Sequence, residues 1–343
     1  MTALRYLLLP ISIIYSWVVW LRNRFFDWGI FKSEKGEIKT IVIGNLSVGG
    51  TGKTPHVEFI VRHLQEQISL AILSRGYGRT TKGFVLADGN ATADKLGDEP
   101  MQIHHKFPTV PLAVCANRLE GIKELKKLFP QTRLVILDDA IQHRRLRGDK
   151  NILLTDYSNP YFRDLMLPTG TLRDNRRENR RAQIIMVTKC PHDLSESQRD
   201  AFIRNIHPNS HQEVVFSTYK YGTPVQFSGP PLLLKDGADI MGFSGIANPA
   251  SFHSFIFRQY SLKRFKIYPD HHRYSKRDLR NLHSAYITFA ALLQGLVTTE
   301  KDATRLGSLL MTNEFKQVPM FFIPVEVKLL HSPENFFEWL TKE

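Results

Sequence analysis

The sequence predicts an α/β fold: a mostly parallel sheet with helices on both faces, followed by a smaller α/β unit. Short apolar, β-branched runs alternate with helix-length stretches such as residues 117–128, which favours parallel strands joined by helices. A glycine-rich turn also joins the first apolar run to a helix. The predicted strands of the larger sheet are residues 41–43, 70–73, 112–115, 134–137, 152–154 and 184–187.

The glycine-rich turn is the most specific motif in the chain. Glycines lack the Cβ atoms that would keep backbone amides from pointing inward, and a helix N-terminus adds its own free amides. In such a motif the lysine reaches the β- and γ-phosphates, and the threonine hydroxyl binds Mg²⁺. The turn predicts a P-loop, NTPase-like fold with a nucleoside triphosphate site at Ser47, Val48, Gly49, Gly50, Thr51, Gly52, Lys53 and Thr54.

The turn departs from the usual pattern at one position, because Ser47 stands where a first glycine is expected. A turn that only caps a helix is the alternative. The sequence after it favours the nucleotide site, because Pro55 suits a first helical turn and apolar residues then recur at helical spacing. These residues are Val57, Ile60, Val61 and Leu64.

A pair of acids ends a second apolar strand. Asp138 and Asp139 follow residues 134–137, and a carboxylate at this place beside a P-loop holds Mg²⁺ directly or through water. An ordinary junction between strand and turn is the alternative. Together with the P-loop, the acids predict a metal site formed by Thr54, Asp138 and Asp139.

Composition restricts the class of partner. The chain has 343 residues, enough for two domains, and a formal net charge of +13, which predicts an anionic partner. Its two cysteines, Cys115 and Cys190, lack His or Cys neighbours at metal spacing, so we expect packed, reduced thiols. Two arginine clusters contain no aromatic residue, which argues against nucleic acid. They are Arg144, Arg145 and Arg147, and Arg173, Arg176, Arg177, Arg180 and Arg181.

The N-terminal segment has the composition of a membrane anchor. Residues 6–21 carry no charge and are flanked by Arg5 and Arg22. A helix of this length spans ~24 Å, short of a ~30 Å hydrocarbon core. Trp17, Trp20 and Trp28 suit a membrane interface. We therefore expect a monotopic or marginally spanning helix on a membrane with anionic lipids, and a buried core helix is the alternative.

We expect four segments along the chain. Residues 1–30 form the membrane-associated helix and residues 31–215 the P-loop domain. A composition change near residue 215 and a break at Gly229-Pro230-Pro231 begin a smaller domain, residues 216–330. Within it, Ser275 and Asp278 form a capping-box signature for a helix. Residues 331–343 contain a final helix near residues 334–340.

Eight short motifs occur in order along the chain: GNLSVGGTGKTP (44–55), SRGYGR (74–79), GDEP (97–100), DDAIQH (138–143), LPTGTLR (167–173), GIANP (245–249), DHH (270–272) and TEKDA (299–303). From about residue 5 to the C-terminus, the chain resembles the tetraacyldisaccharide 4′-kinase family, the lipid A 4′-kinases. Two places depart from the family's pattern. Ala140-Ile141 stands where Gly-Phe is common, and Arg173-Asp174-Asn175 where Arg-Glu-Pro is common.

The resemblance implies a function and a domain arrangement. It implies phosphorylation of the 4′-hydroxyl of a tetraacylated glucosamine disaccharide 1-phosphate, with ATP and Mg²⁺, in lipid A biosynthesis. We further expect a monomer at the cytoplasmic face of the bacterial inner membrane. The two domains would be joined by a two-stranded linker, near residues 214–221 and 320–328, with the final helix packed back on the first domain.

The resemblance also changes the interpretation of two residues. From the sequence alone, Asp98 is more simply a helix N-cap, because Pro100 suits the first turn. In the family the matching aspartate is catalytic and works as a dyad with a histidine that matches His271. Lys53 is the third predicted catalytic residue. Domain closure would bring His271 to Asp98 and exclude water. His272 is an adjacent alternative.

Five further residues are predicted to bind the substrate. Arg75 and Arg79 flank two glycines after a strand and suit a substrate phosphate or the γ-phosphate, with turn solubility as the alternative. His143 follows the paired acids, and Arg173 and Asp174 lie in a family motif. Glu300, Lys301 and Asp302 are predicted as nucleotide-side or domain-contact groups.

Two other functions are alternatives to a kinase. A membrane-associated ATPase switch would carry a second lysine in its P-loop, where this chain has Val48. A basic nucleic-acid-binding module would need stacking aromatic residues or a recognised fold, and neither is found in the sequence.

Overall fold

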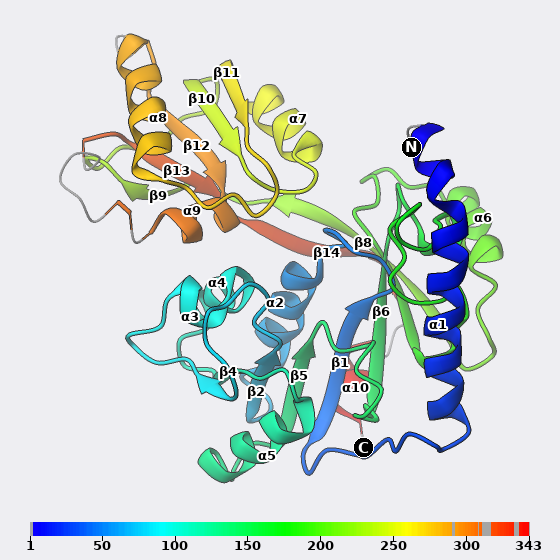
Figure 1. Ribbon diagram of the computed structural model, residues 1–343. Coiled ribbons are helices and arrows are strands. Elements are labelled where there is room, and N and C mark those ends of the chain that lie inside the picture. Colours follow the sequence, from blue (N-terminus) through cyan, green and yellow to red (C-terminus); the bar gives the residue numbers. More distant parts are fainter. Residues whose placement is uncertain (1–2, 290–291, 308, 311–316, 333–335, 343) are drawn as a thin grey trace. The chain divides into compact units, whose positions relative to one another are not determined.

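The computed structural model describes residues 3–289, 292–307, 309–310, 317–332 and 336–342. The chain divides into two compact units (Figure 1): Met1–Tyr219 with Val327–Glu343, and Lys220–Glu326. The larger unit thus extends past the predicted boundary at residue 215 and resumes before residue 331. The reason is that strands β8 (Glu213–Tyr221) and β14 (Val325–His331) are neighbours in its sheet and carry the chain to and from the smaller unit.

The larger unit is built on a nine-stranded sheet with the order β14-β8-β7-β6-β1-β5-β2-β4-β3. Pairs from β8 through β4 are parallel, and only β3 is antiparallel to its neighbour β4 among the pairings described. The carboxyl ends of the central strands therefore meet at one edge, where ligands bind in such sheets. The remaining strands are β1 (Lys39–Asn45), β2 (Leu70–Ser74), β3 (Val85–Leu86), β4 (Leu112–Val114), β5 (Leu134–Asp138), β6 (Lys150–Asp156) and β7 (Ile184–Thr188).

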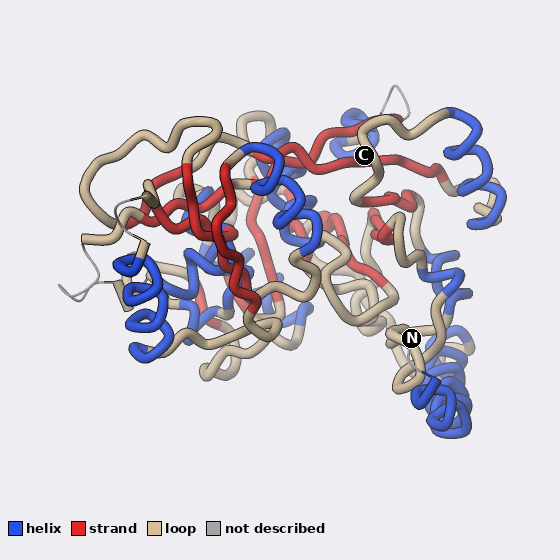
Figure 2. Tube along the Cα trace, turned by 90° about the horizontal axis from the view of Figure 1, so that it is seen from above, coloured by secondary structure: helices blue, strands red, loops and turns tan. Residues whose placement is uncertain are grey.

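Helices cover both faces of this sheet (Figure 2). Side chains alternate along β1, so Ile41 and Ile43 pack on one face and Val42 on the other. The first face carries α2 (Lys53–Leu64), α3 (Ala93–Leu96), α4 (Asp98–Lys106) and α10 (Phe336–Thr341). The second carries α5 (Arg118–Leu128), α6 (Glu196–Ile206) and the 3-10 turn η2 (Tyr161–Arg163). A further 3-10 turn, η3 (Arg176–Arg181), precedes β7.

The final helix packs in the core of the larger unit. Phe336 and Leu340 of α10 are about 1 % exposed and share a cluster with Val57 and Ile60 of the P-loop helix. Residues 333–335, which include the start predicted for this helix at Glu334, lie outside the described residues.

The smaller unit has a five-stranded sheet with the order β11-β10-β12-β13-β9, in which only β9 is antiparallel to its neighbour among the described strands. The predicted capping box of Ser275 and Asp278 is confirmed at the start of α8. The elements are β9 (Val225–Ser228), β10 (Asp239–Ser244), α7 (Ala250–Gln259), β11 (Ser261–Ile267), α8 (Lys276–Thr288), β12 (Gly295–Thr299), α9 (Glu300–Leu306) and β13 (Met320–Ile323).

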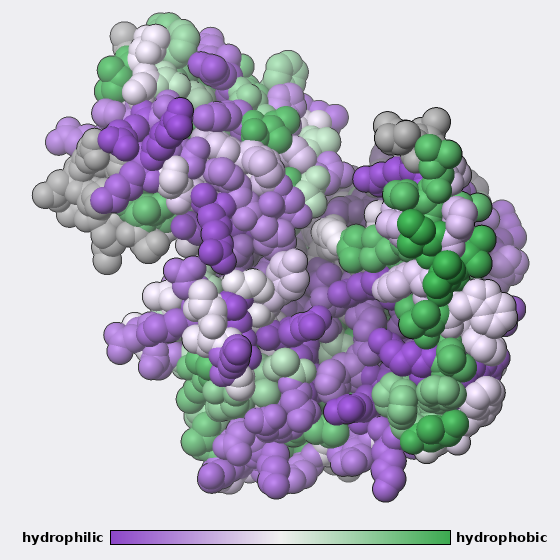
Figure 3. Space-filling view, viewed as in Figure 1, coloured by the Kyte–Doolittle hydropathy of each residue, from purple (hydrophilic) through white to green (hydrophobic). Residues whose placement is uncertain are grey.

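The N-terminal helix shows its polar side to the protein and its apolar side to the outside. After a 3-10 turn, η1 (Ala3–Leu8), helix α1 (Leu9–Asp27) buries Ser12 and Asn23. Ser12 Oγ donates to Thr169 Oγ1 at 2.7 Å and Asn23 Nδ2 to Asp174 Oδ1 at 2.8 Å. Figure 3 shows the apolar side chains along its outer face. The exposed ones include Ile11, Ile13, Ile14, Trp17, Val18 and Leu21.

This exposure contradicts the alternative of a buried core helix, because a core helix would turn its apolar side chains inward. Among the described residues, no helix combines the length and the apolar character needed to cross a membrane.

Candidate active site

The P-loop joins β1 to α2 and presents a row of free amides. Backbone amides of Gly49, Gly50, Gly52, Lys53 and Thr54 donate to no acceptor within the part of the chain that the structure describes. Gly49 and Gly52 have φ of 106° and 89°, which only glycine adopts easily. A Cβ at Gly52 would also overlap the Tyr219 hydroxyl. These amides at a helix N-terminus form an anion-binding site.

The first part of the loop is bonded to a neighbouring segment. The Val48 amide donates to the Thr171 carbonyl at 2.7 Å, and Ser47 forms an isolated bridge with Leu172. The Val48 amide is therefore not among the free donors of the loop, and a contact of Val48 with the nucleotide stays a prediction. Ser47 and Val48 fix the start of the loop against residues 171–172.

The lysine of the motif points to the carboxyl ends of β1 and β5. Lys53 Nζ lies 3.2 Å from Asn45 Oδ1 and 3.8 Å from Asp139 Oδ2. Burial lowers the pKa of the Lys53 ammonium, while the Asp139 carboxylate opposes that shift. The cation is thus held next to the free amides, where it would meet phosphate oxygens.

The paired acids at the end of β5 have different surroundings. Burial, followed by the charge of Asp139, raises the pKa of Asp138 to about 6. Ser74 donates to Asp138 Oδ2 at 3.0 Å, but the buried Oδ1 atom accepts no hydrogen bond. Burial would also raise the pKa of Asp139, but Lys53 and Arg173 lower it below the ordinary value. Asp139 adopts a left-handed backbone, with φ of 50°.

The unpaired Asp138 oxygen fits a metal ion. A buried carboxylate oxygen without a donor is costly unless a cation or proton meets it. Among the described residues, no group of three or more His, Cys, Asp or Glu side chains could hold a metal by themselves. Mg²⁺ at this place would therefore need Thr54, Asp138 and the phosphate oxygens, as in other P-loop proteins.

Two side chains that the sequence did not single out join this network. Asn45 Oδ1 accepts from Lys53 and, at 2.6 Å, from Arg173 Nη2. Arg118, only 2 % exposed, donates to the main-chain oxygens of Asp138 and Asp139. Asn45 lies two residues past the predicted strand 41–43 and Arg118 three past 112–115, so only their nearness to strand ends could have pointed to them. Arg173, predicted to bind substrate, also pairs with Asp139 and so belongs to the same network.

Helix α4 places Asp98 at its first residue. The cap position belongs to Gly97, with φ of 98°, so the interpretation of Asp98 as the N-cap is wrong. A Cβ at Gly97 would come within 2.8 Å of the Tyr77 carbonyl oxygen, because the loop after β2 packs on this helix start. The charge of the next residue, Glu99, acts on the pKa of both Lys53 and Asp138. The start of α4 therefore borders the P-loop and the paired acids.

The predicted substrate residues separate into two groups. Arg75 is exposed. Burial of His143, followed by the charge of Arg118, lowers the pKa of His143 to about 4, and the charge of Arg75 adds to this shift. Arg79, in contrast, donates to the carbonyls of Val114 and Gly83 at 3.2 and 2.6 Å, so it braces its own loop.

Asp174 is buried within the larger unit. Its carboxylate accepts from Asn23 and pairs with Arg181 at 3.6 Å. This burial contradicts the predicted substrate contact, because no part of the carboxylate faces solvent, and it makes Asp174 an anchor of α1.

The two adjacent histidines of the smaller unit, His271 and His272, have different surroundings. His271 is exposed, has a left-handed φ of 55°, and its Nδ1 lies 3.2 Å from Arg305 Nη2. His272 Nε2 lies 3.2 Å from Asp278 Oδ2 and its ring stacks on Tyr268 at 4.7 Å. His272 is thus engaged at the start of α8, which favours His271 for a role in chemistry.

Asp302 organises the neighbourhood of His271. The fully buried carboxylate accepts from the Gly245 amide, the Tyr274 hydroxyl and Arg305, all at 3.0–3.2 Å. Its role is therefore to support the Gly245 turn and Arg305. The predicted roles of Glu300 and Lys301 stay predictions.

A parallel sheet, a P-loop with free amides and an acid pair beside it define a P-loop protein that binds a nucleoside triphosphate. The LpxK family model, tetraacyldisaccharide-1-P 4′-kinase, matches residues 4–343. The chain belongs to this family.

Curated relatives and a solved structure agree with this assignment. The chain is 38 % identical to the tetraacyldisaccharide 4′-kinase of Bacteroides thetaiotaomicron, over 96 % of this chain and 90 % of the relative. It is 37 % identical to that of Phocaeicola vulgatus, over 96 % and 92 %. The crystal structure of "apo" form LpxK from Aquifex aeolicus in complex with ATP is similar with a TM-score of 0.76, 25 % identity and coverage of 99 % of both chains.

Proposed function

We propose that this chain transfers the γ-phosphoryl group of ATP to the 4′-hydroxyl of a tetraacylated glucosamine disaccharide 1-phosphate, a step of lipid A biosynthesis. The observation that carries the proposal is the set of free amides at Gly49, Gly50, Gly52, Lys53 and Thr54, with the Lys53 side chain and Asp138 beside them. Family membership supports the choice of acceptor.

The residues of the larger unit divide the chemistry of phosphoryl transfer, which consists mainly of positioning and charge neutralisation. The free amides and Lys53 hold the triphosphate. Thr54 and Asp138 would hold Mg²⁺, which neutralises developing charge on the phosphate oxygens when it is bound. Asp98 accepts the proton of the 4′-hydroxyl as that oxygen bonds to the γ-phosphorus and ADP leaves. His271 of the smaller unit assists Asp98.

The test is incubation of the chain with ATP, Mg²⁺ and the tetraacylated disaccharide 1-phosphate in detergent micelles, followed by analysis of the lipid product. The wild type should form the 4′-phosphorylated product. Asp98→Ala should bind ATP normally and form product at least about 100-fold more slowly, the usual contribution of a general base. Absence of product from the wild type would overturn the proposal, and full activity of Asp98→Ala would remove this residue from the mechanism.

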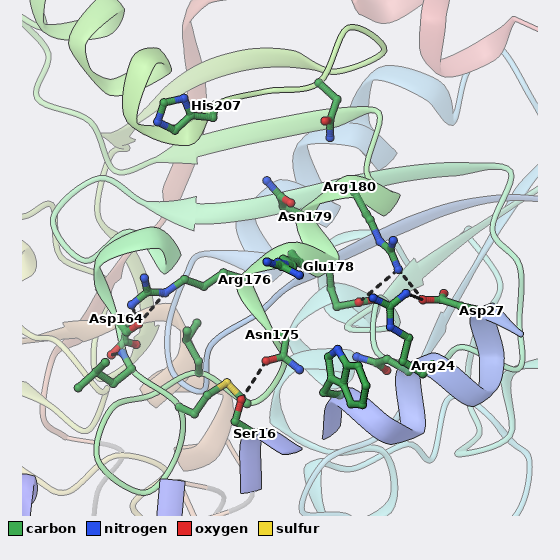
Figure 4. Close-up of a pocket in the computed structure, with 17 residues that line it drawn as sticks. Ser16, Arg24, Asp27, Asp164, Asn175, Arg176, Glu178, Asn179, Arg180 and His207 are labelled. Carbon is green, nitrogen blue, oxygen red and sulfur yellow. Dashed lines mark hydrogen bonds and ion pairs between the residues drawn. The ribbon is translucent and has the colours of Figure 1, made fainter. Parts of the chain in front are cut away.

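We also propose that the enzyme works at the cytoplasmic face of the inner membrane, with α1 lying in the membrane interface. The outward apolar face of α1 supports this, because an exposed stripe of this size marks an interaction surface. Beneath its C-terminal half lies a cleft of about 630 Å³, which Ser16, Trp20 and Arg24 of α1 help to line (Figure 4). The partly exposed Arg24 and three exposed arginines line it and suit anionic lipid headgroups; the exposed ones are Arg176, Arg177 and Arg180.

Co-sedimentation with vesicles tests the membrane proposal. A variant with Ile14→Gln and Trp17→Gln should bind vesicles with anionic lipid at least about tenfold more weakly, because two outward apolar side chains are lost. Phe257→Gln, which alters a similarly exposed side chain of the smaller unit, is the control. Equal binding by both variants would contradict the proposal.

A further inference from the structure

Three consecutive carbonyls of the P-loop are each held by a side chain. The Gly50 carbonyl accepts from Lys189 Nζ, and the Thr51 carbonyl from Thr188 Oγ1 at 2.9 Å. The Gly52 carbonyl lies 2.7 Å from His56 Nδ1. These contacts lie on the side of the loop that faces β7 and β8.

The planar peptide bond makes these contacts important for the opposite side of the loop. In a trans peptide, the carbonyl of one residue and the amide of the next point in opposite directions. A carbonyl fixed toward β7 therefore fixes the next amide away from β7. The contacts at Thr51 and Gly52 thus orient the amides of Gly52 and Lys53, which have no acceptor among the described residues.

The residues that hold the carbonyls are themselves firmly placed. Thr188 is fully buried at the end of β7. Lys189 has a left-handed φ of 57°, an unfavourable conformation for a residue with a side chain, and its Nζ also pairs with Asp156 at 2.7 Å. With this backbone conformation directly after β7, the Lys189 side chain contacts both Asp156 and the P-loop.

His56 connects the P-loop to β8. It is 1 % exposed, and each of its two ring nitrogens lies within hydrogen-bond distance of a partner. With its proton on Nδ1, the ring donates to the Gly52 carbonyl, and its Nε2 faces Ser217 Oγ at 2.9 Å. The Ser217 hydroxyl also lies 3.2 Å from the Val187 carbonyl of β7. Ser217 lies in the strand that leads to the smaller unit.

We propose that Thr188, Lys189 and His56 are positioning residues of the nucleotide site, holding the P-loop so that its amides already face the triphosphate before ATP binds. Donors arranged in advance need no reorganisation when the anion arrives. The inference rests on the proposed function only in requiring that this loop binds ATP. These side chains would act through the backbone and contact no phosphate.

Binding of a fluorescent ATP analogue to the full-length chain, without lipid substrate, tests this. Thr188→Val keeps the shape of the side chain and removes its donor. We expect the Kd of the Thr188→Val variant for the ATP analogue to rise at least about tenfold, the effect of one lost hydrogen bond to a charged or strongly ordered site. Thr188→Ser, which restores the hydroxyl, should bind within about twofold of wild type.

Thr155→Val is the matched control. Thr155 is the next-to-last residue of the neighbouring strand β6 and is also buried. Its hydroxyl oxygen accepts from the Tyr161 amide and makes no contact with a P-loop carbonyl, whereas its main-chain carbonyl, which the substitution keeps, lies 3.3 Å from Thr188 Oγ1. If Thr188→Val bound like wild type, or no more weakly than Thr155→Val, the inference would be overturned. A rise in Kd for Thr188→Val alone supports it, because general loss of stability would affect both variants.

A second pair of variants decides the matter if Thr188→Val does not fold. Ser217→Ala removes the group that orients His56, and Thr218→Val removes an adjacent buried hydroxyl that donates to the Cys190 carbonyl at 2.7 Å. Only Ser217→Ala should weaken nucleotide binding, and equal binding by both would overturn the inference. A chain that bound ATP with this pattern but never phosphorylated the disaccharide would overturn the proposed function alone.

Discussion

Lys53 Nζ lies 3.8 Å from Oδ2 of Asp139, the second of the two acids at the end of β5. The same carboxylate pairs with Arg173, so Asp139 is committed to two cations. Its neighbour Asp138 has one oxygen without any donor. The two acids, equivalent in the sequence, therefore have separate tasks: Asp139 orders the cations of the site, and Asp138 is available to a metal.

The first prediction separates these tasks by isosteric variants. Asp138→Asn should raise the Mg²⁺ concentration for half-maximal kinase activity by roughly 10–100-fold, because it removes the free carboxylate oxygen. Asp139→Asn should shift this concentration less and lower the free energy of unfolding by about 1–3 kcal/mol, because Lys53 and Arg173 lose their partner. An Mg²⁺ titration and a denaturant titration of both variants would check this. The reverse pattern would assign the metal to Asp139.

A second prediction concerns the pH dependence of stability without Mg²⁺. The pKa of Asp138 rises from 3.8 to about 6 on folding. Between these pH values the folded chain retains a proton that the unfolded chain has lost, so this group makes stability fall as the pH rises. Asp138→Asn should therefore be more stable than wild type at pH 7, by up to about 3 kcal/mol, and equally stable at pH 4.

Unfolding by urea at several pH values, with chelator present, measures this difference. Addition of Mg²⁺ should reduce it, because the ion stabilises only the chain that keeps the carboxylate. A constant difference between the two proteins from pH 4 to 7 would contradict the pKa assigned to Asp138.

Much of the fold and part of the site follow from local pattern. All six predicted strands of the larger sheet are present, because a run such as residues 134–137 has a single environment, the buried sheet. The P-loop and the paired acids were placed correctly for the same reason: residues at the ends of parallel strands meet at one edge.

Other parts of the site depend on contacts between distant segments. The amide of Val48 is taken by Thr171, and Asp174 is buried by Asn23 of the first helix. Neither partner is near in sequence. Arg118 reads as an ordinary first residue of a helix until the fold places its guanidinium against the carbonyls after β5. Periodicity and motif spacing carry no information on such pairs.

The third prediction concerns the placement of α4, whose first residue is Asp98. Glu58 of α2 is 3 % exposed and accepts from Gln102 Nε2 at 2.8 Å and Lys106 Nζ at 2.6 Å, both on α4. Glu58→Ala should lower stability by about 2–4 kcal/mol and kcat by about tenfold, because removal of one partner of a buried pair loosens α4. The KM for ATP should change little, since the P-loop amides are untouched.

Glu58→Gln is the matched control for this prediction. It keeps an acceptor for Gln102 in a side chain of the same size, so kcat should recover most of the loss. If Glu58→Ala lowered stability while kcat stayed at the wild-type value, the position of Asp98 would not depend on this contact.

The last prediction separates the two adjacent histidines of the smaller unit. His272 lies 3.2 Å from Asp278 at the start of α8, whereas His271 is exposed beside Arg305. His271→Asn should lower kcat by about 10²–10⁴-fold with an unchanged melting temperature, as expected for a group that assists proton transfer. His272→Asn should lower the melting temperature by a few degrees and leave kcat within about threefold, because it weakens a helix cap.

Combined with Asp98→Ala, His271→Asn should cause little further loss of kcat, since the effects of residues that act as a unit are not additive. A fully additive loss would mean that Asp98 and His271 act independently.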